Sequence, residues 1–467
     1  MLLKKSQIKK HSLPKTAPGL GSLPGCVLNY SVVDSVALPA NQVNLTEDDV
    51  AEDFAQKYAL QLRFDHDVRR WFVWDGNRWN LNKTEMAFDF ARLLCRQHRR
   101  DQHRMGSKKA AEGVEQIARR DQRLAVTSDI WNLDPFLLGT PNGTVQLKTG
   151  VMREARPDDY ITRVTKIAPA TTEATHPIFT KFLAEATGGD EALQRFLRQW
   201  AGYCLTGSTA EQALLFLYGP GGNGKSVFQN VLNEILAEYS TAAQTDTFVA
   251  SKFQSHSTGI AMLHGARLVV ASETDKGHAW SESRINQLTG GDSVTARFMR
   301  ENNFTFRPQF KLLMVGNHRP QLRTVNEAAR RRILIVPFVH KPAQPDHSLA
   351  IKLRAEYPAI LRWMISGCLD WQASGLIKPA SVLKATCDYF EEQDLCGRWL
   401  EECCVQGSGL KAPASALYGS WSAFAAANGE DTGNSKEFSA MLTERGFQKM
   451  KSGSVVYVGL KLKVATG

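Results

Sequence analysis

The central part of the chain alternates between short apolar runs and stretches in which apolar residues recur at helical spacing. The runs have the length and the aliphatic content of buried strands, and apolar residues three or four positions apart indicate amphipathic helices between them. This alternation predicts an α/β fold with a parallel sheet. The predicted strands lie at 214–218, 267–272, 311–316 and 332–338.

Patterns outside this region predict hairpins and further helices. Aromatic residues around Asp75-Gly76 predict a β-hairpin at 69–80, and Asn142-Gly143 predicts a second turn. A third hairpin is expected at 293–306, where apolar side chains alternate on both sides of a polar tip. The segment 435–462 predicts a helix, a turn and a β-wing. Helical spacing covers 45–62, 177–207, 346–377, 380–405 and 413–428.

Composition and charge narrow the classes of function. No apolar run is long enough to cross a bilayer, so a membrane partner is not expected. The eight cysteines form no C-x-x-C pair and have no histidine at ligand spacing, which favours reduced thiols in a cytoplasm over structural zinc. The net charge of +10 favours a polyanionic partner. Positive charge is densest at 96–109, which is either a nucleic-acid contact or a solvated helix face.

The stretch 219–226 reads Gly-Pro-Gly-Gly-Asn-Gly-Lys-Ser and lies between a predicted strand and a predicted amphipathic helix. It fits G-x-x-x-x-G-K-[ST] at every fixed position, although a glycine-rich turn can match by chance. Such a loop turns backbone N–H groups toward the β-phosphate, Lys225 reaches the β- and γ-phosphate oxygens, and Ser226 ligates Mg²⁺. The sequence therefore predicts ATP and Mg²⁺ as cofactors. The predicted binding residues are Gly219, Pro220, Gly221, Gly222, Asn223, Gly224, Lys225 and Ser226.

Two polar residues follow other predicted strands of the sheet. Glu273 closes Leu-Val-Val-Ala-Ser-Glu, where a carboxylate can polarise the attacking water and support Mg²⁺. Asn317 closes Leu-Leu-Met-Val-Gly-Asn and can hydrogen-bond the same water or the γ-phosphate. Ligands of parallel sheets bind outside the carboxyl ends of the strands, so both residues are catalytic candidates. An ordinary strand-end acid and a turn-forming asparagine are the alternatives.

Basic residues at three places are candidates for phosphate contacts. Guanidinium groups at 330–332 are costly to neutralise within one subunit, and Arg331 or Arg332 is expected to reach the γ-phosphate held by a neighbouring subunit of a ring. The alternative for these three arginines, Arg330 included, is a solvated turn. The hairpin arginines and wing lysines are expected to contact a DNA backbone, against the alternative of exposed side chains without a role. These candidates are Arg297, Arg300, Lys449 and Lys451.

Together these motifs resemble a superfamily III helicase. The loop, the strand-end Glu, Leu-Thr-Gly-Gly-Asp at 288–292, Gly-Asn after a strand and Arg-Arg before Ile-x-x-x-Pro-Phe all fall within 219–338. More narrowly, the chain resembles the helicase part of the satellite-phage and plasmid primase-helicases, which are related to the poxvirus type. The likeness extends to 137–147 and to 438–462. In two places the chain departs from the family, with Ser272-Glu273 instead of an acidic pair and Asn286-Gln287 where a Lys is common.

The resemblance implies an AAA+-like, parallel-sheet P-loop core between two further domains. The predicted regions are a flexible tail or linker at 1–44, an N-terminal α+β domain with the basic helical stretch at 45–176, a helical segment at 177–207, the ATPase core at 208–345, a helical lid at 346–380 and a C-terminal winged-helix-like DNA-binding domain at 381–467.

The function implied by the resemblance is an ATP-dependent DNA helicase for replication of a phage, a plasmid or an integrated mobile element. Its partners would be single-stranded and forked DNA, copies of itself in a ring that is typically hexameric, and a primase or polymerase on a separate chain, because the sequence has no room for a primase domain. It would work on DNA in the cytoplasm of a bacterial host. The alternative is an ATP-dependent DNA-binding switch, such as an origin or interference factor, that hydrolyses ATP without processive unwinding.

Overall fold

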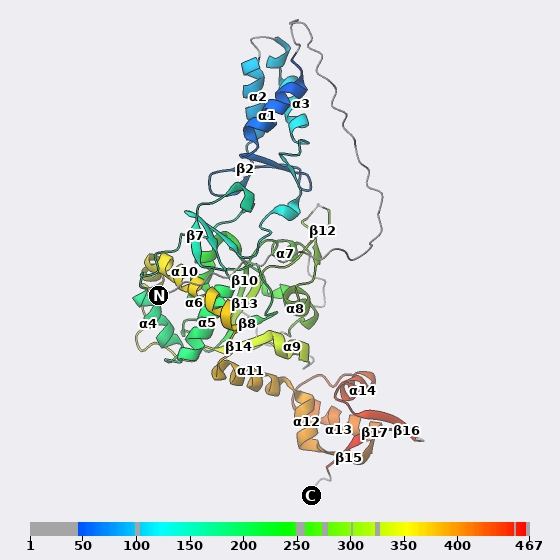
Figure 1. Ribbon diagram of the computed structural model, residues 1–467. Coiled ribbons are helices and arrows are strands. Elements are labelled where there is room, and N and C mark those ends of the chain that lie inside the picture. Colours follow the sequence, from blue (N-terminus) through cyan, green and yellow to red (C-terminus); the bar gives the residue numbers. More distant parts are fainter. Residues whose placement is uncertain are drawn as a thin grey trace, which may run out of the picture. The chain divides into compact units, whose positions relative to one another are not determined.

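The computed structural model describes residues 45–98, 103–248, 257–272, 279–299, 302–322, 327–452 and 454–463 (Figure 1). The predicted tail at 1–44 lies outside these residues, as do Glu273 and Arg300 and positions 99–102 of the basic stretch. Within the described part of the chain, no helix is long and apolar enough to cross a membrane.

A five-stranded sheet in which all neighbouring strands are parallel forms the centre, in the order β14-β8-β13-β10-β9. The four predicted strands are confirmed to within a residue or two at their ends. The fifth strand, β9, was not predicted, because three residues make no recognisable apolar run. The strands are β8 Leu214–Tyr218, β9 Ser240–Ala242, β10 Leu268–Ser272, β13 Lys311–Gly316 and β14 Ile333–Pro337.

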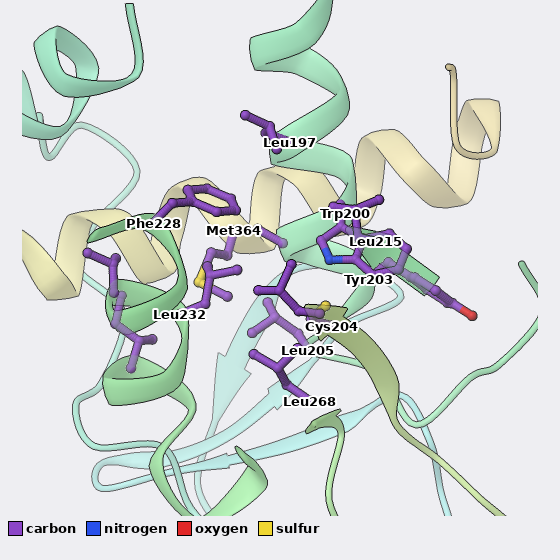
Figure 2. Close-up of a cluster of buried hydrophobic side chains, with 14 of the residues drawn as sticks. Leu197, Trp200, Tyr203, Cys204, Leu205, Leu215, Phe228, Leu232, Leu268 and Met364 are labelled. Atoms are coloured by element: carbon purple, nitrogen blue, oxygen red, sulfur yellow. The ribbon is translucent and has the colours of Figure 1, made fainter. Parts of the chain in front are cut away.

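Alternate side chains of these strands enter two separate cores, since successive residues of a strand point to opposite faces. On one face, Leu215 and Leu268 join residues from helices α4 Pro177–Ala186, α5 Glu191–Tyr203, α6 Lys225–Leu236 and α10 Leu349–Ser374. Helix α10, predicted as a lid, packs along α5 and α6 as part of this core. Figure 2 shows this packing around the buried side chains Leu197, Trp200, Tyr203, Phe228, Leu232 and Met364.

The opposite face buries the other half of the strand residues, including Leu214 and Phe216. Helix α11 packs against β14, where the Ile335 N–H donates to Thr386 Oγ1 at 3.0 Å. Because Tyr389 and Phe390 of α11 belong to this core, the predicted boundary at 381 falls within the core. The elements here are α7 Ser257–Ala261, α8 Glu282–Thr289, β11 Val294–Ala296, β12 Phe304–Phe306, α9 Glu327–Arg332 and α11 Ala380–Gln393, and β11 pairs with β12 as the predicted third hairpin.

The N-terminal part consists of three helices and two sheets. The hairpins predicted at 69–80 and at Asn142-Gly143 are confirmed, whereas the helix predicted over 45–62 ends at Tyr58 and a strand begins at Leu62. The second sheet contributes Leu138 and Val145 to the central core. The elements are α1 Glu47–Tyr58, α2 Met86–His98, α3 Lys108–Ala118, the sheet of β3 Trp79–Leu81, β2 Arg70–Trp74, β1 Leu62–Asp65 and β4 Ala125–Val126, and the sheet of β5 Leu137–Thr140, β6 Gly143–Gln146 and β7 Val151–Arg153. Short 3₁₀ helices lie at η1 His103–Gly106, η2 Ser128–Ile130, η3 Pro157–Asp159, η4 Ala237–Tyr239 and η5 Thr245–Thr247.

The C-terminal module has its own core around Trp399, Phe438 and Tyr457. The helical prediction for 380–405 is wrong at its end, because a ten-residue strand begins at Cys404 and pairs with the last strand of the chain. The helix predicted over 413–428 begins one residue later, at Ala414, with Pro413 as its N-cap residue. The elements are α12 Leu395–Cys403, β15 Cys404–Pro413, α13 Ala414–Ala427, α14 Ser435–Glu444, β16 Gln448–Ser452 and β17 Ser454–Leu462, and the antiparallel sheet has the order β15-β17-β16.

Candidate nucleotide site

The loop at 219–224 joins the carboxyl end of β8 to the amino end of α6. Gly224 precedes the helix with a left-handed backbone (φ +86°), and a Cβ at this position would lie 2.7 Å from the Phe182 ring. A Cβ at Gly219 would lie closer still to the backbone oxygen of Phe338, which follows β14. Side chains other than hydrogen would therefore displace the loop at both ends, which explains the glycines at these two positions.

Lys225 is the first residue of α6, and its side chain is only 5% exposed. Its ammonium donates to Gly219 O at 2.6 Å, to Pro220 O at 3.0 Å and to Asn223 Oδ1 at 2.9 Å. Burial lowers the pKa of Lys225 from its ordinary value. The Asn223 amide in turn donates to Phe338 O, so the loop, its lysine and the end of β14 form one hydrogen-bonded unit.

The amino end of α6 can accept an anion. The described structure shows no side chain that caps this end, and Ser226 in the first turn is exposed. Uncapped N–H groups and the helix dipole give a helix start a partial positive charge. Together with the Lys225 ammonium and the Ser226 hydroxyl, they give this end of the helix the donors that suit an anion such as a phosphate.

Asn317 lies at the same edge of the sheet as the loop. β13 is the neighbour of β8, and the register pairs Gly316 with Tyr218, so that both strands end side by side. Asn317 is exposed there and lines a cavity of about 270 Å³ together with Tyr218 and Arg319. The Arg319 guanidinium lies 4.7 Å from the centre of the Tyr218 ring and pairs with Glu392 of α11. Arg319 was not among the predicted site residues, although its position two residues after Asn317 was a usable signal.

The predicted carboxylate, Glu273, is not among the described residues, but the strand that precedes it is. β10 ends at Ser272, which pairs with Val315 of β13. The end of β10 therefore lies at the same sheet edge as Asn317, separated from the loop strand by β13.

The three arginines lie at the opposite end of the strands from the loop. They end α9, which leads into the amino end of β14, and β14 runs parallel to β8. The length of the strand, about 17 Å for five residues, separates them from the loop of the same chain. Arg331 is exposed, whereas Arg332 is 7% exposed and donates to Ala328 O at 3.2 Å and to Gln212 Oε1 at 3.4 Å. The Arg330 guanidinium lies 5.1 Å from the centre of the Phe390 ring.

The remaining candidates lie on two antiparallel structures, the 293–306 hairpin and the C-terminal sheet. Arg297 follows β11 in the 293–306 hairpin and is exposed. Lys449 and Lys451 are exposed on β16, and the Lys449 ammonium donates to Ser439 Oγ of α14 at 3.1 Å. Both lysines pair with residues of β17 that share the face of Tyr457, so they lie on the helix side of the small sheet.

Two family models match the chain. Residues 51–188 match the model described as D5 N terminal like, and residues 217–332 match the model of a family of unknown function. The N-terminal match and the viral relatives named below support a likeness to D5-like phage and viral primase-helicases. This confirms the resemblance drawn from the motifs. The second match contains the loop, Asn317 and all three arginines of the D5-like chain.

The relatives of the chain include viral proteins. It is 24% identical over 290 residues to a protein of Acanthamoeba polyphaga mimivirus whose name proposes a helicase, with 56% of the chain and 30% of that protein covered. A protein of Frog virus 3 with a similar name is 25% identical over 235 residues, with 46% and 24% covered. The chain thus spans less than a third of the length of these relatives. Among solved structures, the apo C-terminal region of NrS-1 covers 89% of the chain and 99% of its own length, at 9% identity and a TM-score of 0.49.

Proposed function

We propose that the chain is an ATP-dependent DNA helicase that works as a ring. The observation that carries this proposal is the loop at 219–224, which ends at an uncapped helix start and holds the Lys225 ammonium, with Asn317 at the same sheet edge. In this proposal the central sheet with its helices is an AAA+-like P-loop core, and the nucleotide binds across the carboxyl ends of β8, β13 and β10.

Each residue at this edge has one task. Lys225 binds the β- and γ-phosphates, and the N–H groups at the start of α6 surround the β-phosphate. Ser226 would hold Mg²⁺, which would supply positive charge beside the phosphates. Asn317 orients the attacking water or the γ-phosphate, and Glu273 at the end of β10 polarises this water.

The position of the arginines supports a site that is completed by a second subunit. Arg331 lies near the amino end of β14, whereas its own loop follows the carboxyl end of β8. It therefore cannot reach the nucleotide of its own chain without a large rearrangement. It is exposed, whereas Arg332 is tied to groups of its own chain. We propose that Arg331, and not Arg332, contacts the γ-phosphate held by the neighbouring subunit. A head-to-tail contact of this kind forms a ring when the rotation between successive subunits closes.

DNA is the proposed polyanionic partner. Arg297 and Arg300 of the hairpin contact the phosphate backbone in the ring, and the C-terminal module acts as a winged-helix-like domain whose Lys449 and Lys451 meet the duplex. The net charge of +10 supports such a partner. Replication of a phage, a plasmid or an integrated element is the process that fits the family.

The test compares Lys225→Ala with Lys181→Ala. Lys181 is an exposed lysine on α4, so its loss controls for a general change of charge. ATP hydrolysis and strand separation on a forked duplex are measured for the parent and both variants. We expect Lys225→Ala to abolish both activities and Lys181→Ala to retain them. Hydrolysis by the parent without strand separation would favour the DNA-binding switch, and full activity of Lys225→Ala would refute the proposed site.

A further inference from the structure

The hairpin of β11 and β12 has a row of stacked aromatic rings. The Phe298 and Phe304 rings are 5.6 Å apart and inclined by 17°, and the Phe304 and Phe306 rings are 5.8 Å apart and inclined by 28°. His264 lies against the two inner rings at 5.5 and 5.1 Å. The rings thus continue from one to the next toward the tip.

Exposure increases along this row. Phe306 is 7% exposed and belongs to the core under the sheet, Phe304 is half-buried, and Phe298 is 37% exposed. Met299, next in the chain, is 73% exposed. Burying a phenylalanine side chain stabilises a fold, so leaving two adjacent large apolar side chains exposed beside a tip forgoes stability. Phe298 stacks on the half-buried Phe304 ring.

The surroundings of Phe298 favour a nucleic-acid ligand over an apolar protein surface. Segment 293–307 contains three arginines and one glutamate, and Arg297 and Arg307 are exposed. Cationic groups beside an aromatic face are the combination found in sites for single strands, where the phosphates meet the cations and the bases stack on the rings. Stacking tolerates any base, since every base has a π-face.

We propose that Phe298, supported by Phe304 and flanked by Met299, is a stacking platform for an unpaired base of single-stranded DNA. The hairpin then holds the strand through its bases as well as through its phosphates. This inference rests on the proposed helicase function and adds a base contact to it.

The test separates base contacts from backbone contacts. Binding of labelled oligo(dT) and of an abasic oligonucleotide of the same length is measured for the parent, Phe298→Ala, Phe298→Trp and Ile351→Ala. Ile351 is an exposed apolar residue of α10 and serves as the matched control. We expect Phe298→Ala to weaken oligo(dT) binding about 5- to 100-fold while abasic binding and the salt dependence stay unchanged. Phe298→Trp, which keeps an aromatic face, and Ile351→Ala should bind both probes as the parent does.

Two outcomes would overturn the base contact. Equal losses for both probes in Phe298→Ala would mean that the residue supports only the backbone contact. Unchanged DNA affinity with a changed mass of the assembly would mean that Phe298 contacts a neighbouring subunit. In either case the parent still binds oligo(dT) and hydrolyses ATP, whereas a parent that binds neither probe would contradict the helicase proposal itself.

Discussion

Gly224→Ala is the substitution whose effect follows most directly from the structure. Gly224 lies between the phosphate loop and α6 with φ +86°, and the added Cβ would lie 2.7 Å from Cε2 and 3.3 Å from Cζ of Phe182. Phe182 is 6% exposed and packs against Phe179, so its ring has little space to withdraw. The change therefore adds backbone strain and overpacking at one point.

The two costs can be estimated separately. A non-glycine residue in the left-handed region costs about 1–2 kcal/mol, and overpacking a core costs about 1–3 kcal/mol. We expect the unfolding free energy of the core to fall by about 2–5 kcal/mol. Phe182→Leu removes the two ring atoms that the Cβ would meet. In this background, adding Gly224→Ala should lower the unfolding free energy only by the backbone strain of about 1–2 kcal/mol.

The assay is denaturant unfolding combined with titration of ATP. Relief of the overlap by movement of the loop would shift the N–H groups at the start of α6, so ATP affinity should fall at least about tenfold, equivalent to about 1.4 kcal/mol. Gly221→Ala is the matched stability control, since a Cβ there meets no atom within 4 Å. It should leave the unfolding free energy unchanged or raise it by up to about 1 kcal/mol. Parental stability and ATP affinity in Gly224→Ala would refute the reasoning.

Three further predictions concern other parts of the core. Burial lowers the pKa of Lys311 to about 7 from 10.5. Between these two values the unfolded chain binds more protons than the folded chain, so the unfolding free energy should rise with pH by up to about 1.4 kcal/mol per pH unit. Lys311→Met should remove this rise, which denaturant unfolding from pH 6 to 10 would measure. Asn317→Ala should lower kcat for ATP about 10²-fold with little change in ATP affinity, and an equal loss of affinity would assign the residue to ground-state binding. Arg332→Ala should lower the unfolding free energy by about 1–3 kcal/mol because of its buried hydrogen bonds, whereas Arg331→Ala should melt like the parent and lose ATP hydrolysis.

The parts of the fold that the sequence could predict are those that depend on local signals. The four longer strands show as apolar runs, the hairpins as Asp-Gly and Asn-Gly turns, and the loop as fixed glycine spacings. β15 carries no such signal, because Gly407 and Gly409 and its mostly exposed side chains are typical of a loop. It becomes a strand only through pairing with β17, which lies some fifty positions further along the chain.

The order of the strands in the sheet could not be predicted, because local sequence patterns do not determine which strands pair. The parallel pairing of β14 with β8 is what puts Arg331 and the loop at opposite ends of the strands. Burial alone distinguishes Arg332 from Arg331. Lys311 begins β13 and Arg267 precedes β10 by one residue, and both look like exposed cations in the sequence. The structure buries both, with the Lys311 ammonium donating to Thr206 O and the Arg267 guanidinium donating to Leu137 O at 2.7 Å.

ATP hydrolysis by mixtures of Lys225→Ala and Arg331→Ala chains tests most directly whether one site is built from two subunits. Each variant alone should be inactive. In an equal, random mixture, an intact site forms wherever a chain with intact Lys225 meets a neighbour with intact Arg331, which is about a quarter of the head-to-tail interfaces. The account predicts that hydrolysis returns to about a quarter of the parental rate per chain. Absence of any recovery at every mixing ratio, with the mixed assemblies shown to form, would contradict it.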